Sequence, residues 1–133
     1  MDPAELIARF EIFDDWEERY RYLIQMGRKL PEFPEDLRND TNKVVGCISQ
    51  VWVVSDFVDG RIQLQADSDA FIVKGLIAML VTLFNNKTAE EVLAVDIESI
   101  FREIGLDEHL SPNRRNGFVA MVSRIRNMAQ ATT

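Results

Sequence analysis

Apolar side chains recur at helical spacing near the start of the chain and predict two helices. The first runs through Leu6 and Phe10, which share one side, and Asp2 stands at the position of its N-cap. The second follows the candidate N-cap Asp15 and ends near Gly27, a residue typical of helix C-termini. The polar, proline-containing segment that comes next predicts a surface loop.

A β-hairpin pattern follows this loop. Residues 51–54 are β-branched or aromatic, Asp59 and Gly60 are typical of a type I′ turn, and apolar and polar residues alternate over 61–66. One face of the hairpin is therefore expected to be covered and the other exposed, which favours an antiparallel sheet over a parallel one. A short third strand over 42–45 is also expected.

The two-residue turn predicts the register of the hairpin. It pairs Phe57 with Ile62, and further along the strands it places Trp52 on the polar face beside Asp67. An indole on a polar face is unusual. Either the register differs from this prediction or another group covers Trp52.

The second half of the chain predicts a set of helices. Residues 70–84 are apolar almost all round, which indicates a buried central helix. Lys74 interrupts this segment, which is shorter than the roughly 18–20 residues that cross a bilayer. Capping residues at Thr88, Asp96 and Ser111 predict three further helices.

Together these elements predict an α+β fold, in which several helices pack a small antiparallel sheet of about three strands. The chain has 133 residues, which is enough for a core, and we expect a single domain over residues 1–133. The start of the sequence has neither a basic segment nor a continuous apolar one, so no signal peptide is expected and a cytoplasmic location is the default.

Charge and composition exclude several classes of function. Fifteen basic against twenty-two acidic residues give a net charge of −7, so nucleic acids and anionic membranes are not expected as partners. The chain has one cysteine, Cys47, and one histidine, His109. Zinc and iron–sulfur sites built from these residue types need about three or four ligands, so no metal site of that kind is expected.

Cys47 is the main candidate for chemistry. A lone cysteine is most often a small buried hydrophobe. Here it follows Gly46, which permits a backbone turn, and it precedes the predicted hairpin, so a nucleophilic or sulfur-accepting role is also open. Lys43 is the nearby cation, and nothing local guarantees a lowered thiol pKa. One expectation is therefore that a partner protein activates the Cys47 thiol.

The segment around Cys47 resembles the cysteine loop of the SufE family, the sulfur acceptors that work with cysteine desulfurases. The similar segment covers residues 42–53. Three other parts of the chain also resemble family motifs, in the family order: 16–20 with 27–31, 67–76, and 109–114. The resemblance therefore extends over nearly the whole chain.

The resemblance implies a fold shared with the IscU/NifU scaffold proteins, without their cluster ligands. It implies that the protein is not an enzyme by itself but a carrier, in which Cys47 accepts persulfide sulfur from a SufS-type desulfurase and stimulates it. The sulfur would pass to an iron–sulfur scaffold such as SufBCD. The chain would bind no cofactor, the desulfurase would use pyridoxal phosphate, and the carrier would be a monomer or a weak homodimer.

Four more residues are candidates for partner binding or for setting the cysteine loop. Gly46 and Gln50 belong to the loop itself. Asp69 is either a cap of the helix that follows or a residue that sets the loop, as the resemblance suggests. Arg114 lies in the first turn of a predicted helix, where the helix dipole disfavours a cation, so a docking role explains it better than folding does.

Three alternatives to this interpretation stay open. Ile48 departs from the polar residue common in the family, whereas Ser49 and Gln50 favour the SufE type over the related CsdE type of acceptor. The chain could instead be a stand-alone thiol enzyme, with Cys47 as the nucleophile and His109 as its base. It could also be an interaction module whose cysteine is inert.

Overall fold

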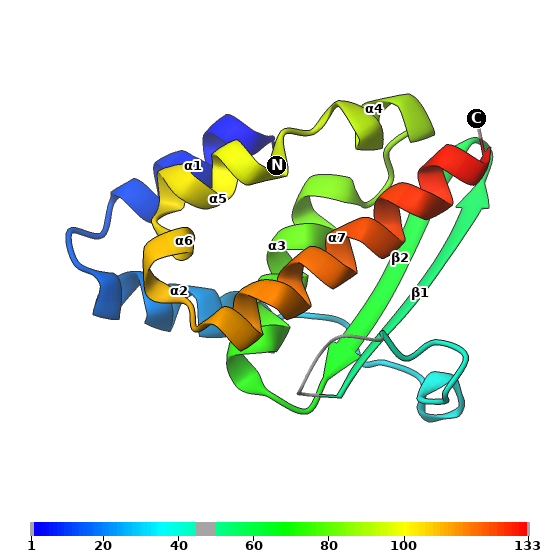
Figure 1. Ribbon diagram of the computed structural model, residues 1–133, viewed down its shortest axis with the longest axis horizontal. Coiled ribbons are helices and arrows are strands. Elements are labelled where there is room, and N and C mark those ends of the chain that lie inside the picture. Colours follow the sequence, from blue (N-terminus) through cyan, green and yellow to red (C-terminus); the bar gives the residue numbers. More distant parts are fainter. Residues whose placement is uncertain (1, 45–49, 133) are drawn as a thin grey trace.

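The computed structural model describes residues 2–44 and 50–132, and Figure 1 shows the arrangement of its elements. The N-terminal half contains helices α1 (Pro3–Glu11) and α2 (Trp16–Arg28), the 3-10 turn η1 (Glu35–Leu37), and strands β1 (Val51–Val58) and β2 (Arg61–Ser68). The C-terminal half contains helices α3 (Phe71–Phe84), α4 (Ala89–Ala94), α5 (Ile97–Ile104), α6 (Leu106–His109) and α7 (Pro112–Thr132). This is an α+β fold, as predicted.

Helices α1, α2, α4 and α5 begin at their predicted caps. The side chains of Asp2 and Asp15 accept backbone N–H bonds of 2.9 and 2.8 Å in the first turns of α1 and α2. Thr88 forms a reciprocal capping box at the start of α4, and Asp96 caps α5. Gly105 ends α5 in the left-handed conformation, with φ of 92°. The single turn α6, which comes directly afterwards, was not predicted from the sequence.

The hairpin has the predicted turn and register. Asp59 and Gly60 both have positive φ, as a type I′ turn requires, and Trp52 lies opposite Asp67. The sheet is smaller than expected, because the described residues contain two paired strands where about three were predicted. In place of a third strand, Lys43 forms a single antiparallel bridge to Trp52.

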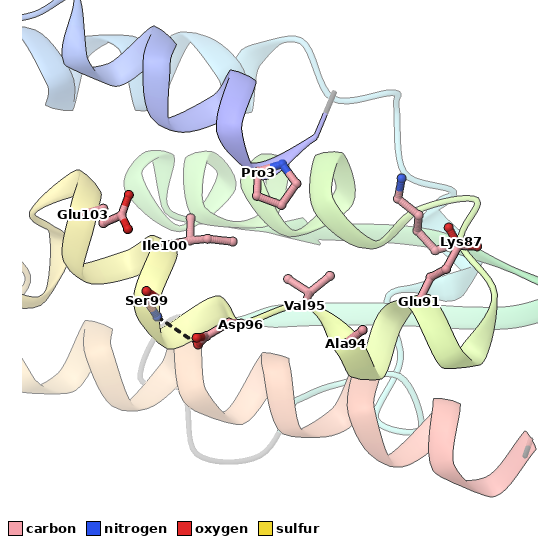
Figure 2. Close-up of a pocket in the computed structure, with 9 residues that line it drawn as sticks. All are labelled: Pro3, Lys87, Glu91, Ala94, Val95, Asp96, Ser99, Ile100 and Glu103. Carbon is pink, nitrogen blue, oxygen red and sulfur yellow. Dashed lines mark hydrogen bonds between the residues drawn. The ribbon is translucent and has the colours of Figure 1, made fainter.

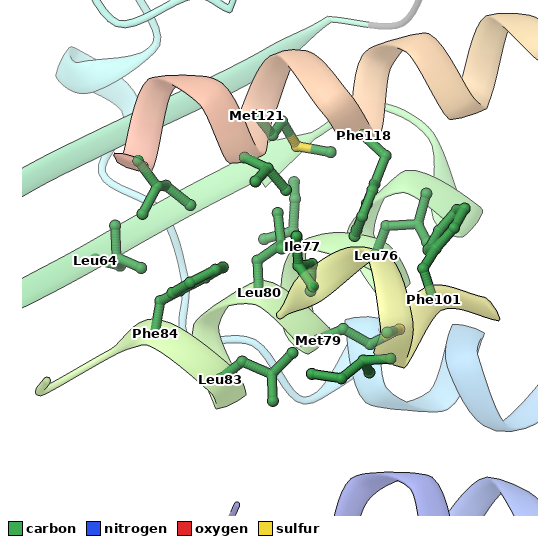
Figure 3. Packing of buried hydrophobic residues seen from close by; sticks show 14 of the residues in the cluster. Leu64, Leu76, Ile77, Met79, Leu80, Leu83, Phe84, Phe101, Phe118 and Met121 are labelled. Carbon is green, nitrogen blue, oxygen red and sulfur yellow. The ribbon is translucent and has the colours of Figure 1, made fainter. Parts of the chain in front are cut away.

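The hydrophobic core is built around α3. Ten of its fourteen residues are buried, because α2, β2 and α7 all pack against it (Figure 1). Figure 3 shows Leu76, Ile77 and Leu80 of α3 meeting Phe118 and Met121 of α7. Within the described residues, no helix is both long and apolar enough to cross a membrane.

Two glycines set the contact between α2 and α3. Helix α2 ends at Arg28, one residue beyond the predicted stop at Gly27, but Gly27 keeps a helical backbone without a positive φ and so does not act as a left-handed cap. A Cβ on Gly27 would come within 2.6 Å of the Gly75 backbone nitrogen, and a Cβ on Gly75 would come within 2.7 Å of the Leu23 Cγ. These distances are too short for real side chains, so the glycines are required for the close approach of the two helices.

Candidate functional site

The candidate site is the segment that carries Cys47. Residues 45–49, with Gly46 and Cys47 among them, lie outside the described part of the chain, but the residues on both sides are well defined by hydrogen bonds. The Val44 N–H donates to the Val51 carbonyl at 2.8 Å, and the Val53 N–H donates to the Asn42 carbonyl at 2.9 Å. The two ends of the cysteine segment are therefore held side by side by antiparallel pairing.

An arginine from α7 holds the arm that leads into this segment. The Arg124 guanidinium donates to the carbonyls of Lys43 and Thr41, at 3.3 and 3.0 Å. Arg124 lies about eighty residues away in sequence, and its helical position resembles that of any exposed arginine. Sequence reasoning therefore missed this anchor and had no signal with which to find it.

Asp69 and Gln50 hold the other end of the segment. The Gln50 N–H donates to Asp69 Oδ1 at 3.0 Å, and the Asp69 N–H donates to the Gln50 carbonyl at 3.3 Å. The capping interpretation of Asp69 is wrong, because α3 begins without a side-chain N-cap bond and Ser68 Oγ accepts instead from the Ala70 N–H. We call Val44, Gln50, Asp69 and Arg124, with the backbone hydrogen bonds between 42–44 and 51–53, the frame of the cysteine segment.

The buried carboxylate of Asp67 lies opposite Trp52 in the hairpin, and its ion pair with Arg38 explains how Trp52 is covered. Asp67 is buried and forms ion pairs with Arg38 and, at 3.4 Å, with Lys74 Nζ. The Arg38 guanidinium also lies 5.8 Å from the centre of the Trp52 ring and 5.7 Å from that of Phe33. Trp52 is thus covered by a cation on the polar face of the hairpin. The predicted pairing of Trp52 with Asp67 was the signal that such a cover was needed.

The charges around Asp67 change its pKa. Burial acts to raise the pKa of this carboxyl, but hydrogen bonds from Arg38 and the Ser68 backbone and the charge of Lys74 outweigh it and hold the pKa below its ordinary value of 3.8. Because the pKa of Asp67 is lower in the folded protein than in the unfolded chain, its ionised carboxylate stabilises the fold at pH values above 3.8. This stability is lost as the pH falls through the folded-state pKa.

Replacing this carboxylate should therefore have a pH-dependent cost. We expect Asp67→Asn to lower the free energy of unfolding at pH 7 by about 2 kcal/mol, since the hydrogen bonds that it weakens involve charged groups. The difference from wild type should shrink below pH 3.8. Urea unfolding at several pH values measures it, with the exposed Asp14→Asn as a control. A difference that is the same at acid and neutral pH would contradict this account.

The structure places the candidates Arg114 and His109 in different surroundings near the start of α7. The Arg114 side chain is exposed and makes no hydrogen bond or close ion pair within the described residues, although its backbone N–H donates to Ser111 Oγ. The neighbouring Arg115 donates to the Leu110 carbonyl at 3.4 Å. His109 stacks on the Trp16 ring, with centroids 4.4 Å apart. Arg114 therefore differs from these neighbours in that its side chain has no contact of this kind within the described residues.

A hollow elsewhere on the surface offers less chemistry. It has a volume of about 430 Å³ and lies between the start of α1 and helices α4 and α5 (Figure 2). Two of its acids already have structural roles, because Glu91 belongs to the capping box of α4 and Asp96 caps α5. Among the described residues that line it there is neither cysteine nor histidine. The frame of the cysteine segment remains the better candidate site.

Comparisons with known proteins agree with the predicted resemblance. The family model for SufE, described as an Fe–S metabolism associated domain, matches residues 4–129. Two uncharacterized SufE-like proteins, from Rhizobium meliloti (strain 1021) and Rhizobium etli, are each 45% identical over 130 residues. These matches cover 95% of this chain and 93% and 88% of the relatives.

A solved structure supports the fold. The solution structure of a hypothetical protein from Thermus thermophilus matches with a TM-score of 0.79. The match covers 97% of this chain and 93% of the other, at 23% sequence identity. The family match extends over nearly the whole chain, and the resemblance predicted from the sequence is confirmed: the chain belongs to the SufE family of Fe–S metabolism associated domains.

Proposed function

We propose that this protein is a sulfur acceptor, in which Cys47 takes sulfur from the persulfide of a cysteine desulfurase and so stimulates that enzyme. The observation that carries the proposal is the frame around residues 45–49. Residues 42–44, before this segment, are bonded to β1 and to α7, and Gln50, after it, is bonded to Asp69 just before α3. A site of this kind holds one cysteine between fixed ends, which suits a thiol that has to meet another protein's sulfur.

The proposed step is an exchange at a sulfur–sulfur bond. The Cys47 thiolate attacks the outer sulfur of the desulfurase persulfide, and a bond forms between that sulfur and Cys47 Sγ. The original sulfur–sulfur bond breaks, and the desulfurase cysteine leaves as a thiolate. One thiolate is consumed and one is released, so the step needs no external oxidant or reductant. A single cysteine is sufficient.

The surroundings favour a carrier over a stand-alone thiol enzyme. Such an enzyme would use His109 as the base, but this ring stacks on Trp16 in the described structure. Two exposed cations are near at hand: Lys43 precedes the frame residue Val44 in sequence, and Arg114 lies on α7. Arg114 is free to bind the desulfurase, so activation of the thiol would come with docking.

The partners follow from the family and the loop residues. Ser49 and Gln50 favour a SufS-type desulfurase over one that uses a CsdE-type acceptor, and an iron–sulfur scaffold of the SufBCD type would receive the sulfur. Pyridoxal phosphate would belong to the desulfurase, and this chain would work without a cofactor of its own. We propose that it acts in the cytoplasm as a monomer or a weak homodimer.

Mass spectrometry of the intact protein tests the proposal. The protein is incubated with an active SufS-type desulfurase and free cysteine, with and without reductant, and in parallel with a desulfurase of the other type. We expect a gain of at least one sulfur atom that maps to Cys47 and is lost on reduction. No gain with a desulfurase that is active and binds the protein would contradict the acceptor role. Turnover of a small substrate without any desulfurase would favour the thiol enzyme instead.

Asp69 should control how accessible Cys47 is in the free protein. We expect Asp69→Ala to raise the rate of Cys47 alkylation several-fold, because it removes the side-chain acceptor of the Gln50 N–H. Stability should change by no more than about 1 kcal/mol, since the lost hydrogen bond is exposed. The rate is measured with iodoacetamide below the unfolding transition.

Asp14→Ala is the matched control, because Asp14 is exposed and distant in sequence from the frame. It should leave the alkylation rate of Cys47 unchanged. Equal rates for Asp69→Ala and the wild type would show that the bond between Asp69 and Gln50 does not restrain the cysteine segment.

A further inference from the structure

A groove between α5 and α7 has no role in the proposed sulfur transfer. It has a volume of about 360 Å³, within the range of pockets that take ligands or partner side chains. Phe101 of α5 and Phe118 of α7 stack beneath it, with ring centroids 4.6 Å apart, and Figure 3 shows the two rings between these helices. None of its lining residues belongs to the frame of the cysteine segment.

Helix α7, which forms one wall of the groove, carries apolar surface that is not buried in the core. Phe118 and Val122 are buried on the side of α7 that packs inward, as the helical pattern predicts. Val119 also lines the groove, but 57% of it is exposed to solvent. The apolar stripe of α7 therefore extends beyond the core and into the groove, where nothing in the described chain covers it.

The charge of this region has the opposite sign to that of the whole protein. Helix α7 contains four arginines and no acidic residue, so the rest of the chain holds eleven basic and twenty-two acidic residues. A protein with a net charge of −7 thus presents one markedly basic helix. An acidic ligand would be attracted to this helix and repelled by much of the remaining surface.

The arginines at the groove are only partly neutralised. Arg126 pairs with Glu98 at 2.9 Å, whereas Arg115 donates to a carbonyl. Arg102 makes no hydrogen bond or close ion pair among the described residues, although its charge helps to lower the pKa of Glu98. Asp107 is the other acid that lines the groove. Three guanidinium groups therefore face two carboxylates, and the groove has room for further negative charge.

From this geometry we propose that the groove docks an acidic amphipathic helix of a partner protein. One bulky apolar side chain of that helix would sit on Phe118 and Val119, and its carboxylates would pair with Arg102 and Arg115. A groove between two helices suits a third helix, and the basic rim selects an acidic one. The inference does not depend on the sulfur-acceptor role, because the groove and the frame share no residue.

A designed peptide tests this proposal on the full chain. The probe is a fluorescein-labelled helical peptide with leucine and phenylalanine on one face and glutamate at its other positions. Its control has lysine in place of each glutamate. We expect the acidic peptide to bind and the basic one not to, with fluorescence anisotropy as the measurement. Backbone NMR shifts caused by the acidic peptide should lie on α5 and α7.

Two variants of the groove make the test specific. Val119→Asp and Arg102→Glu change exposed side chains and should each weaken binding of the acidic peptide by about tenfold or more. Val58→Asp is the matched control, because Val58 is 49% exposed on the hairpin, and it should bind as the wild type does. Circular dichroism checks the fold, and sulfur acceptance by Val119→Asp should stay normal.

Several results would overturn the proposal. These are no binding of the acidic peptide at millimolar protein, equal binding of the basic peptide, shifts confined to other helices, or unchanged binding by both groove variants. Because sulfur acceptance is measured separately, failure here would leave the proposed function intact.

Discussion

Replacing Cys47 with serine is expected to abolish sulfur acceptance completely. The chain contains one cysteine, so no second thiol can replace it, and a serine hydroxyl is neither ionised near neutral pH nor able to form a stable persulfide. The free energy of unfolding should stay within about 1 kcal/mol of the wild-type value, because the substitution exchanges one atom. The measurement is intact-protein mass after incubation with an active desulfurase, together with urea unfolding.

The same variant separates binding from transfer. If docking uses Arg114 and the frame, Cys47→Ser should still bind the desulfurase and should inhibit sulfur transfer to wild-type protein in a mixture. Arg114→Ala is the complementary variant, since it should weaken docking and leave the thiol in place. If Cys47→Ser still stimulated the desulfurase, the protein would be an interaction module with an inert cysteine. An unfolded variant would mean that Cys47 belongs to the core.

The parts of the fold that were predictable depend on neighbours in sequence. A helix cap is a contact between residues three apart, as in the bond from the Glu18 N–H to Asp15. The hairpin register follows from a two-residue turn, because Asp59 and Gly60 leave one way to pair the strands. Such features need no knowledge of the rest of the molecule, and the sequence predicts them correctly.

Contacts between distant residues were only partly predictable. The expected position of Trp52 beside Asp67 indicated that a cover was missing, but nothing in the sequence identified Arg38 as that cover. Arg124 gave no indication that it would bind the carbonyls of Thr41 and Lys43. In the candidate site, the chemistry of Cys47 and the importance of Asp69 came from the family resemblance, whereas the hydrogen bonds of the frame came from the structure.

Gly27 shows how a correct residue can be given the wrong reason. Glycine is common at helix ends because it adopts positive φ, and this local rule predicted a stop. The helix does end one residue later, at Arg28, but the structure places Gly27 against Gly75, where two helix backbones meet. A glycine needed for close packing has no local signature, since its partner lies forty-eight residues further along the chain.

Replacing Gly75 with alanine should destabilise the protein strongly, although it adds a single methyl group. The new Cβ would lie 2.7 Å from the Leu23 Cγ and 2.8 Å from the Leu23 carbonyl carbon, so α2 and α3 would have to move apart. In an exposed helix the same change would stabilise by about 1 kcal/mol. Because the clash involves backbone in a packed core, we expect destabilisation by about 3 kcal/mol or more.

A double-mutant cycle with Gly27→Ala tests the cause of this loss. A Cβ on Gly27 would meet the α3 backbone at Gly75 and Lys74, so Gly27→Ala alone should also destabilise. Once one methyl group has separated the helices, the second should cost less, and the double variant should be less destabilised than the two single changes added together. Urea unfolding of all four proteins measures the coupling. A neutral or stabilising Gly75→Ala would mean that α2 and α3 do not pack at this distance, and additive losses would mean that the two glycines act at separate contacts.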